Sequence, residues 1–379
     1  MAAIGRAEHV GSLLRPDYLL AARSGYVTGE LTAAEFKAVE DRAVREVIAL
    51  QQDAGCPVVT DGELRRESFQ SEFTAAVDGV AGAGLDAWLW GDWHSDIVGD
   101  VHVERPRDLA VVGPLRKRRN LAAEEFTFLR SCLGQGSAEG SGPIAKVTLP
   151  SPSLFANLWS PEHAAEPYLS LDDFLADVVG VLCDEVRELT RLGCRYIQLD
   201  APHYPLLVDP AWQEFYQHRG WDLDRCLSYG VELDNAVIDA GRPATFGFHL
   251  CRGNQQSRWL VSGGYDAIAG GIFGAIDADR LLLEYDDERS GGFDPLRLVP
   301  DDKTVVLGLV TTKRPDLETM DALLARVRDA SNLIGRERLA VGTQCGFATS
   351  LRGNAISIDD ERRKLALVVH TAELAFGEV

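Results

Sequence analysis

The chain has 379 residues, enough for one large domain or two ordinary ones, and its 46% hydrophobic and 25% charged residues are typical of a soluble globular protein. Its 58 acidic and 38 basic residues give a formal net charge of −20, which would repel a nucleic-acid backbone or an anionic membrane surface overall. Since no run of about 20 apolar residues or signal-peptide core is visible, we expect a cytoplasmic protein with neither a nucleic-acid nor a membrane partner.

Strand-like apolar runs alternate with segments of helical periodicity along the chain. The predicted strands span residues 7–12, 57–62, 144–149, 196–200, 244–250, 280–285, 304–310 and 338–344. Clear helical spacing lies between them, at 33–55, 171–193 and 316–335. This α/β alternation predicts one domain over residues 1–379 with the fold of a TIM (β/α)8 barrel, which typically needs about 250 residues and tolerates insertions. A doubly wound open sheet is the alternative, but no glycine-rich dinucleotide fingerprint follows the first strand.

An insertion interrupts this alternation near residues 85–125. Within it "DVHVE" and "LAVVG" alternate in polarity around "RPRD", which predicts an inserted β-hairpin that borders the barrel mouth. The three tryptophans of this insertion, Trp88, Trp90 and Trp93, favour packing over ligand stacking.

Polar residues follow most of the predicted strands. In a TIM barrel the carboxyl ends of the strands share one face, which carries the active site. The residues expected at that face are Ser12, Asp61, Glu63, Asp200, His249, Cys251, Glu284, Lys313 and Cys345.

Four of these residues form a set of metal-ligand types. His249 and Cys251 lie two positions apart on a predicted strand, so their side chains point to the same side. Together with Glu284 and Cys345 they offer nitrogen, sulfur and oxygen donors suited to Zn²⁺. The alternative is that each is incidental, since a buried Cys often acts as a small hydrophobe. A Glu directly after "RLLL" is costly to bury without a partner, which favours the zinc site.

Six separated motifs resemble the C-terminal catalytic barrel of the cobalamin-independent methionine synthase family, over about residues 5–375. They are "HVGSLLRP", "TDGELRRESF", "QLDAPHY", "FHLCRGN", "LLLEYDDERS" and "VGTQCGFAT". The resemblance implies zinc held by His249, Cys251, Glu284 and Cys345. It also implies that Ser12 binds the carboxylate of homocysteine, and that Glu63 and Asp200 bind its amino group.

The sequence departs from the full-length pattern of that family in two places. The second, N-terminal barrel is absent, so the chain resembles the short single-barrel branch, whose methyl donor need not be a folate. Thr311 and Lys313 stand just beyond the seventh predicted strand, where the full-length enzyme has an aspartate and a histidine. Lys313 could steer an anionic donor or relay a proton. Arg65 and Arg66 could recognise an anionic substrate, or could begin a solvated helix.

These features predict a zinc-dependent enzyme that transfers an alkyl group, methyl above all, to the sulfur of homocysteine. This activity would be like that of 5-methyltetrahydropteroyltriglutamate–homocysteine S-methyltransferase, with Lys313, Glu63 and Asp200 as catalytic candidates. Zinc would activate the thiol, and Glu284, the single oxygen ligand, would yield to the entering sulfur. The partners are then a small thiol and an alkyl donor, either folate or another, with a homo-oligomer left open. The alternatives are an epoxyalkane transferase acting on a thiol like coenzyme M, and a zinc-binding protein without catalysis.

Overall fold

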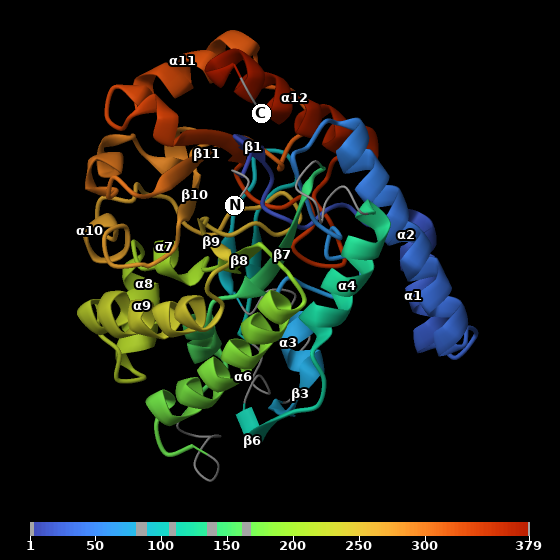
Figure 1. Ribbon diagram of the computed structural model, residues 1–379. Helices are drawn as coiled ribbons and strands as arrows, with labels where there is room; N and C mark the ends of the chain where they lie inside the picture. Colours follow the sequence, from blue (N-terminus) through green and yellow to red (C-terminus); the bar gives the residue numbers. More distant parts are fainter. Residues whose placement is uncertain (1–3, 81–88, 106–110, 135–141, 161–167, 378–379) are drawn as a thin grey trace.

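The computed structural model describes residues 4–80, 89–105, 111–134, 142–160 and 168–377. Its main sheet has eight parallel strands in the order β1-β12-β11-β10-β9-β8-β7-β2, with helices arranged around them (Figure 1). These strands are β1 (Ala7–Glu8), β2 (Val58–Val59), β7 (Ile144–Pro150), β8 (Tyr196–Asp200), β9 (Thr245–Leu250), β10 (Arg280–Glu284), β11 (Thr304–Val310) and β12 (Leu339–Thr343). The fold predicted from the alternation, a TIM barrel, is confirmed.

Each of α2, α4, α6, α9, α11 and α12 is preceded by a residue whose side chain accepts a hydrogen bond from a backbone N–H of the first turn. Thr32, for example, forms a reciprocal capping box with Glu35 at the start of α2. The helices are α1 (Asp17–Val27), α2 (Ala33–Asp53), α3 (Ser71–Ala76), α4 (Leu121–Leu133), α6 (Leu171–Arg191), α7 (His203–Leu206), α8 (Pro210–Gln217), α9 (Leu223–Ala240), α10 (Ala269–Ile272), α11 (Met320–Ser331) and α12 (Ile358–Phe376). Short 3-10 turns are η1 (Pro152–Asn157), η2 (Glu288–Ser290), η3 (Asp294–Leu298) and η4 (Arg336–Arg338). The helix predicted from residue 316 starts later, because the Thr319 side chain caps it.

The barrel has a seam between β1 and β2. Each of these strands has only two residues, and the sheet order leaves the two at opposite ends. Beyond the strands, Leu13 N donates to the Gly62 carbonyl at 3.0 Å, and Thr60 Oγ1 donates to the Gly11 carbonyl at 2.6 Å. The chain after β1 and β2 is therefore irregular where the sequence predicted strands to residues 12 and 62, and its loops close the barrel at the mouth.

A layer of charged residues fills the barrel interior near the amino ends of the strands. The Lys146 ammonium lies 3.1 Å from one Glu8 carboxylate oxygen, and Arg280 donates to the other at 2.7 Å. Tyr196 also donates to Glu8, at 2.8 Å. These side chains are buried, and their ion pairs and hydrogen bonds offset the free-energy cost of removing the charges from water.

The insertion forms two antiparallel pairs in place of one hairpin around "RPRD". β4 (Gly91–Trp93) pairs with β5 (Val101–Val103), and β3 (Val77–Val80) pairs with β6 (Val111–Lys117). An inserted hairpin is therefore present. Among the described residues, 101–103 of "DVHVE" and 111–113 of "LAVVG" belong to strands that pair with earlier strands, and not with each other. Alternating polarity identifies a strand face without identifying the partner strand, which explains the wrong pairing.

The tryptophans of the insertion differ in their surroundings. Trp90 packs on Trp212 and Phe215, with both pairs of ring centroids 4.8 Å apart, as expected for a packing role. Trp93 is fully buried, and Trp88 lies outside the described residues. Among the described helices, none combines the length and apolar character needed to cross a membrane.

Candidate metal centre and substrate pocket

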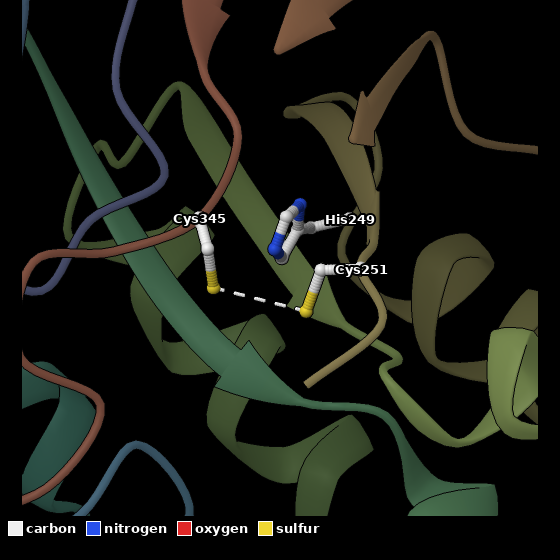
Figure 2. A group of neighbouring side chains, drawn as sticks. All are labelled: His249, Cys251 and Cys345. Carbon is white, nitrogen blue, oxygen red and sulfur yellow. Dashed lines mark hydrogen bonds between the residues drawn. The ribbon is translucent and has the colours of Figure 1, made fainter. Parts of the chain in front are cut away.

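Three of the four predicted metal ligands converge at the carboxyl end of the barrel. His249 lies within β9, Cys251 directly follows that strand, and Cys345 follows β12. Their ligand atoms all lie within 4.8 Å of one another, and the two sulfurs are 3.7 Å apart. Figure 2 shows the imidazole and both thiols facing a common space. The prediction that β9 and β12 bring these residues together agrees with this geometry.

The orientation of the His249 ring leaves one nitrogen available. Its Nδ1 lies 3.2 Å from the Leu282 carbonyl oxygen, to which an Nδ1–H donates. Nε2 is buried and has no hydrogen-bond partner among the described residues. Histidines that bind metals commonly donate their other ring N–H to such an acceptor. A hydrogen bond from Cys345 also holds the pKa of the Cys251 thiol well below its usual range, which favours a thiolate ligand.

This donor set fits zinc on chemical grounds. A nitrogen and two sulfurs are preferred ligands of Zn²⁺, and catalytic zinc sites combine three protein ligands with one open position. The unpartnered Nε2 is the observation that speaks most directly for a cation there, because a buried polar atom without a partner is costly.

Glu284 lies outside this group of three. Its Oε2 accepts from the Arg252 backbone N–H at 2.6 Å, and its Oε1 accepts from Arg289 at 2.8 Å and from Lys313 at 3.3 Å. Burial would raise the pKa of Glu284, but Lys313, Arg289 and Arg252 outweigh that effect and hold it below its usual range. The carboxylate is therefore ionised and directed to cations. Its role as fourth metal ligand stays a prediction.

Lys313 is buried beside the same carboxylate. Its ammonium lies 3.3 Å from Glu284 and 3.6 Å from Asp286. It is not among the residues that line the pocket described next. Lys313 thus forms part of an ionic cluster next to the site.

One pocket unites the three convergent ligands with the predicted acceptor contacts. Ser12, Glu63 and Asp200 line it together with His249, Cys251 and Cys345. Its other lining residues are mainly apolar or small: Val10, Phe69, Leu89, Trp93, Pro202, Gly253, Asn254, Gly346 and Thr349. Leu89 and Trp93 come from the insertion, which therefore borders the barrel mouth as predicted.

Glu63 lines this pocket, and its Oε1 lies 3.9 Å from the Arg66 guanidinium. Its Oε1 accepts from Thr148 Oγ1 at 2.6 Å, whereas Oε2 is buried without a hydrogen-bond partner among the described residues. The backbone of Glu63 has a φ of 57°, in the left-handed region that few residues other than glycine adopt. Asp61 Oδ1 accepts from the Glu63 N–H at 2.9 Å and supports this turn.

Asp200 ends β8 on the other side of the pocket. Gln198 Nε2 donates to its Oδ1 at 2.7 Å. Burial raises the pKa of Asp200 to about 7, although His249 acts in the opposite direction. A cationic group of a ligand next to Asp200 would offset the cost of burying its charge.

Arg65 and Arg66 have other partners. Arg65 donates to Asp41 at 2.5 Å and lies over the Phe128 ring. Arg66 is buried and donates to Glu125 at 2.7 Å and to the Thr148 carbonyl at 3.0 Å. Neither is among the residues that line the pocket, so the structure does not bring them to an anionic substrate there.

Sequence reasoning missed several residues around the site. Arg252 and Arg289, which hold Glu284, stand inside the quoted motifs "FHLCRGN" and "LLLEYDDERS". Asn254 lines the pocket, and its Nδ2 donates to the Gly346 carbonyl at 2.7 Å. Gly346 itself is required by space, because a Cβ there would lie 1.9 Å from Ser12 Oγ. The sequence marked each of these residues only by its place in a family motif. Their contacts in the structure show what each one holds in place.

Comparisons with known proteins identify the family of this chain. Residues 162–373 match the model of the family described as "Cobalamin-independent synthase, Catalytic domain". Among curated proteins, the chain is 32% identical to the uncharacterized protein YxjH of Bacillus subtilis, covering 97% of this chain and 93% of that protein. It is 25% identical to the methionine synthase of Pyrococcus abyssi, covering 89% of this chain and 85% of that protein.

A solved structure supports the fold. The B12-independent methionine synthase from Shewanella sp. W3-18-1 is 20% identical, covers 98% of both chains and has a TM-score of 0.70. The family match includes β9, β10 and β12, and thus all four residues predicted as metal ligands. On these grounds the chain belongs to the cobalamin-independent methionine synthase family and contains its catalytic domain.

Proposed function

We propose that this protein transfers a methyl group to the thiol of homocysteine or a close amino-acid analogue. One observation carries the proposal: the metal-ligand side chains His249, Cys251 and Cys345 share a pocket with Ser12, Glu63 and Asp200. A nucleophilic sulfur and the polar end of an amino acid could occupy that pocket at the same time. Membership in the methionine synthase family points to the same reaction class.

We assign the metal to His249, Cys251 and Cys345. Zinc bound there would act as a Lewis acid that lowers the pKa of the acceptor thiol and so favours its nucleophilic form at neutral pH. The chain itself fixes the imidazole through the Leu282 carbonyl, which directs Nε2 towards the two sulfurs.

The acceptor is recognised at its amino-acid end. The free Oε2 of Glu63 and the carboxylate of Asp200 accept from the ammonium group, and the Ser12 hydroxyl donates to the carboxylate. The apolar side chains of Phe69, Leu89 and Trp93 exclude water from the reacting sulfur.

Glu284 would be the fourth ligand of the metal when no acceptor is bound. Its carboxylate has an alternative set of donors in Arg252, Arg289 and Lys313, so its release from the metal leaves no unpaired buried charge. This pairing suits the exchange of Glu284 for the substrate sulfur.

The methyl donor is left open between folate and another small donor. The epoxyalkane alternative relied on Arg65 and Arg66 as anion-binding residues, and their pairing with Asp41 and Glu125 removes that support. A zinc-binding protein without catalysis would not need the carboxylates of Glu63 and Asp200 in the pocket.

The first prediction concerns metal and thiol binding. Purified protein should hold about one zinc per chain, and homocysteine should change the zinc absorption-edge spectrum because its sulfur becomes a ligand. Cys251→Ala and Cys345→Ala should lose most of the metal and all methyl transfer, yet stay folded. Cys194→Ala is the matched control, since this thiol is equally buried but donates to the Tyr196 carbonyl. Full metal content in either ligand variant would disprove the assignment.

A further inference from the structure

Arg15 lies at the seam of the barrel, three residues after Ser12. Its side chain is buried, and both terminal nitrogens donate to backbone carbonyls. Nη2 donates to the carbonyls of Glu63 at 2.9 Å and Arg66 at 2.7 Å, while Nη1 donates to those of Ser350 at 2.8 Å and Ala348 at 3.2 Å. One guanidinium thus joins the loop after β2 to the loop after β12.

These two loops, and the loop of Arg15 itself, carry pocket residues. Ser12 precedes Arg15 by three positions, Glu63 lies on the β2 loop, and Cys345 begins the β12 loop. The Phe347 N–H also donates to the Ser12 carbonyl at 2.8 Å. Because β1 and β2 are not neighbours in the strand order, such loop contacts are what fixes the relative positions here.

The backbone of Glu63 is one of the parts that this arrangement holds. Its left-handed backbone, at a φ of 57°, is unfavourable for a residue with a side chain and persists only where surrounding contacts hold it. Arg15 binds the carbonyl of Glu63 itself and that of Arg66 in the same turn. Loss of these bonds would let the turn relax and would move the free Oε2 away from the pocket.

Arg15 is not suited to bind the substrate directly. It is not among the lining residues, and each of its terminal nitrogens already donates to two carbonyls. Any effect of Arg15 on the acceptor must therefore pass through the loops that it holds.

We propose that Arg15 is a positioning residue that fixes the carboxylate of Glu63 in the pocket and thereby sets the preference for thiols that carry an amino group. This inference rests on the proposed function, because it concerns the acceptor of the same site.

The test compares two ligands by calorimetry on the zinc-loaded protein: homocysteine and its deaminated analogue, 4-mercaptobutanoate. Arg15→Gln should weaken homocysteine binding about tenfold and leave the binding of the analogue within about twofold. Glu63→Gln should show the same selective loss, and the double variant should lose no more than Glu63→Gln alone, since both changes act on one contact. Arg15→Lys, which keeps the charge and part of the hydrogen bonding, should lie between Arg15→Gln and the unchanged protein.

Arg338→Gln is the matched control, because this guanidinium also donates to backbone carbonyls, those of Lys303 at 3.2 Å and Val299 at 3.0 Å, away from the pocket. It should alter neither affinity. Equal weakening of both ligands in Arg15→Lys, or additive losses in the double variant, would overturn the positioning role. If the unchanged protein itself bound both ligands equally, the proposed acceptor would be wrong, which is a separate outcome.

Discussion

At the scale of single residues, the ion pairs of Lys313 change the role that the sequence suggested for it. The sequence suggested that this lysine steers an anionic donor or relays a proton. In the structure its ammonium lies between Glu284 and Asp286, and Asp286 Oδ2 has no hydrogen-bond partner among the described residues. An ammonium placed between two buried carboxylates has little charge left to attract a distant anion. We infer that Lys313 mainly balances the charge of the cluster around Glu284.

The second prediction follows from this position. Lys313→Met should lower the free energy of unfolding by about 3 kcal/mol, because removal of one partner leaves buried carboxylates short of a cation. Lys313→Arg should lose much less, since it keeps the positive charge. Urea unfolding of the three proteins measures the difference. A Lys313→Met variant as stable as the unchanged protein, with weaker donor binding, would restore the steering role.

At the scale of elements, α12 packs its first turn against the loop after β1. Glu361 is completely buried in that turn, and its Oε2 accepts from the Leu14 N–H at 2.8 Å. Burial raises the pKa of Glu361 to about 8, while the hydrogen bond from Leu14 acts in the opposite direction. The junction between the last helix and the first loop therefore contains a carboxyl group that is protonated at neutral pH.

A pH dependence follows as the third prediction. Between the unfolded pKa of 4.5 and the folded pKa of about 8, the folded chain keeps a proton that the unfolded chain has lost. The stabilising effect of this carboxyl is thus complete below pH 4.5 and declines as pH rises to about 8. Glu361→Gln keeps an acceptor for Leu14 and cannot ionise. Its free energy of unfolding relative to the unchanged protein should therefore increase over that range, by about 1.4 kcal/mol per pH unit at most. The free energy of unfolding of both proteins is measured from pH 5 to 9. A constant difference between them over that range would contradict the raised pKa of Glu361.

At the scale of the whole molecule, the barrel separates its charged groups into two levels. Glu8, Lys146 and Arg280 form an internal ionic layer at the amino ends of the strands, and the candidate site lies at the carboxyl ends. Lys146 also donates to Gln198 Oε1 at 2.7 Å, and Gln198 donates to Asp200 in the pocket. The layer therefore supports one wall of the site as well as the barrel.

The fourth prediction tests that layer. Lys146→Met should lower the free energy of unfolding by about 3 kcal/mol, the lower end for a broken buried ion pair, because Arg280 and Tyr196 still bind Glu8. Lys303→Met is the control: this lysine is also buried but donates to the Ala278 carbonyl, so its loss should be smaller. Thermal and urea unfolding measure both. If both variants lost the same free energy of unfolding, the ion pair of Lys146 would add no stability beyond that of any buried lysine.

The sequence by itself determined the barrel and the residue types that gather at its mouth. Residues 196–200 and 304–310 form strands with the predicted bounds, because an apolar run buried on both faces is a local property of the chain. His249 and Cys251 point to one side for an equally local reason, the twofold period of a strand. The prediction that these residues bind a metal needed only their types and spacing.

The tertiary structure decided which partner each polar group meets. The donors to Glu284, the ion pairs of Arg65 and Arg66, and the pairing of the insertion strands all depend on competition among groups distant in sequence. Arg15 illustrates the reason, since its carbonyl partners include Ala348, 333 positions away along the chain. Local patterns specify which face of an element is buried, whereas a contact across such a separation exists only once the barrel has closed.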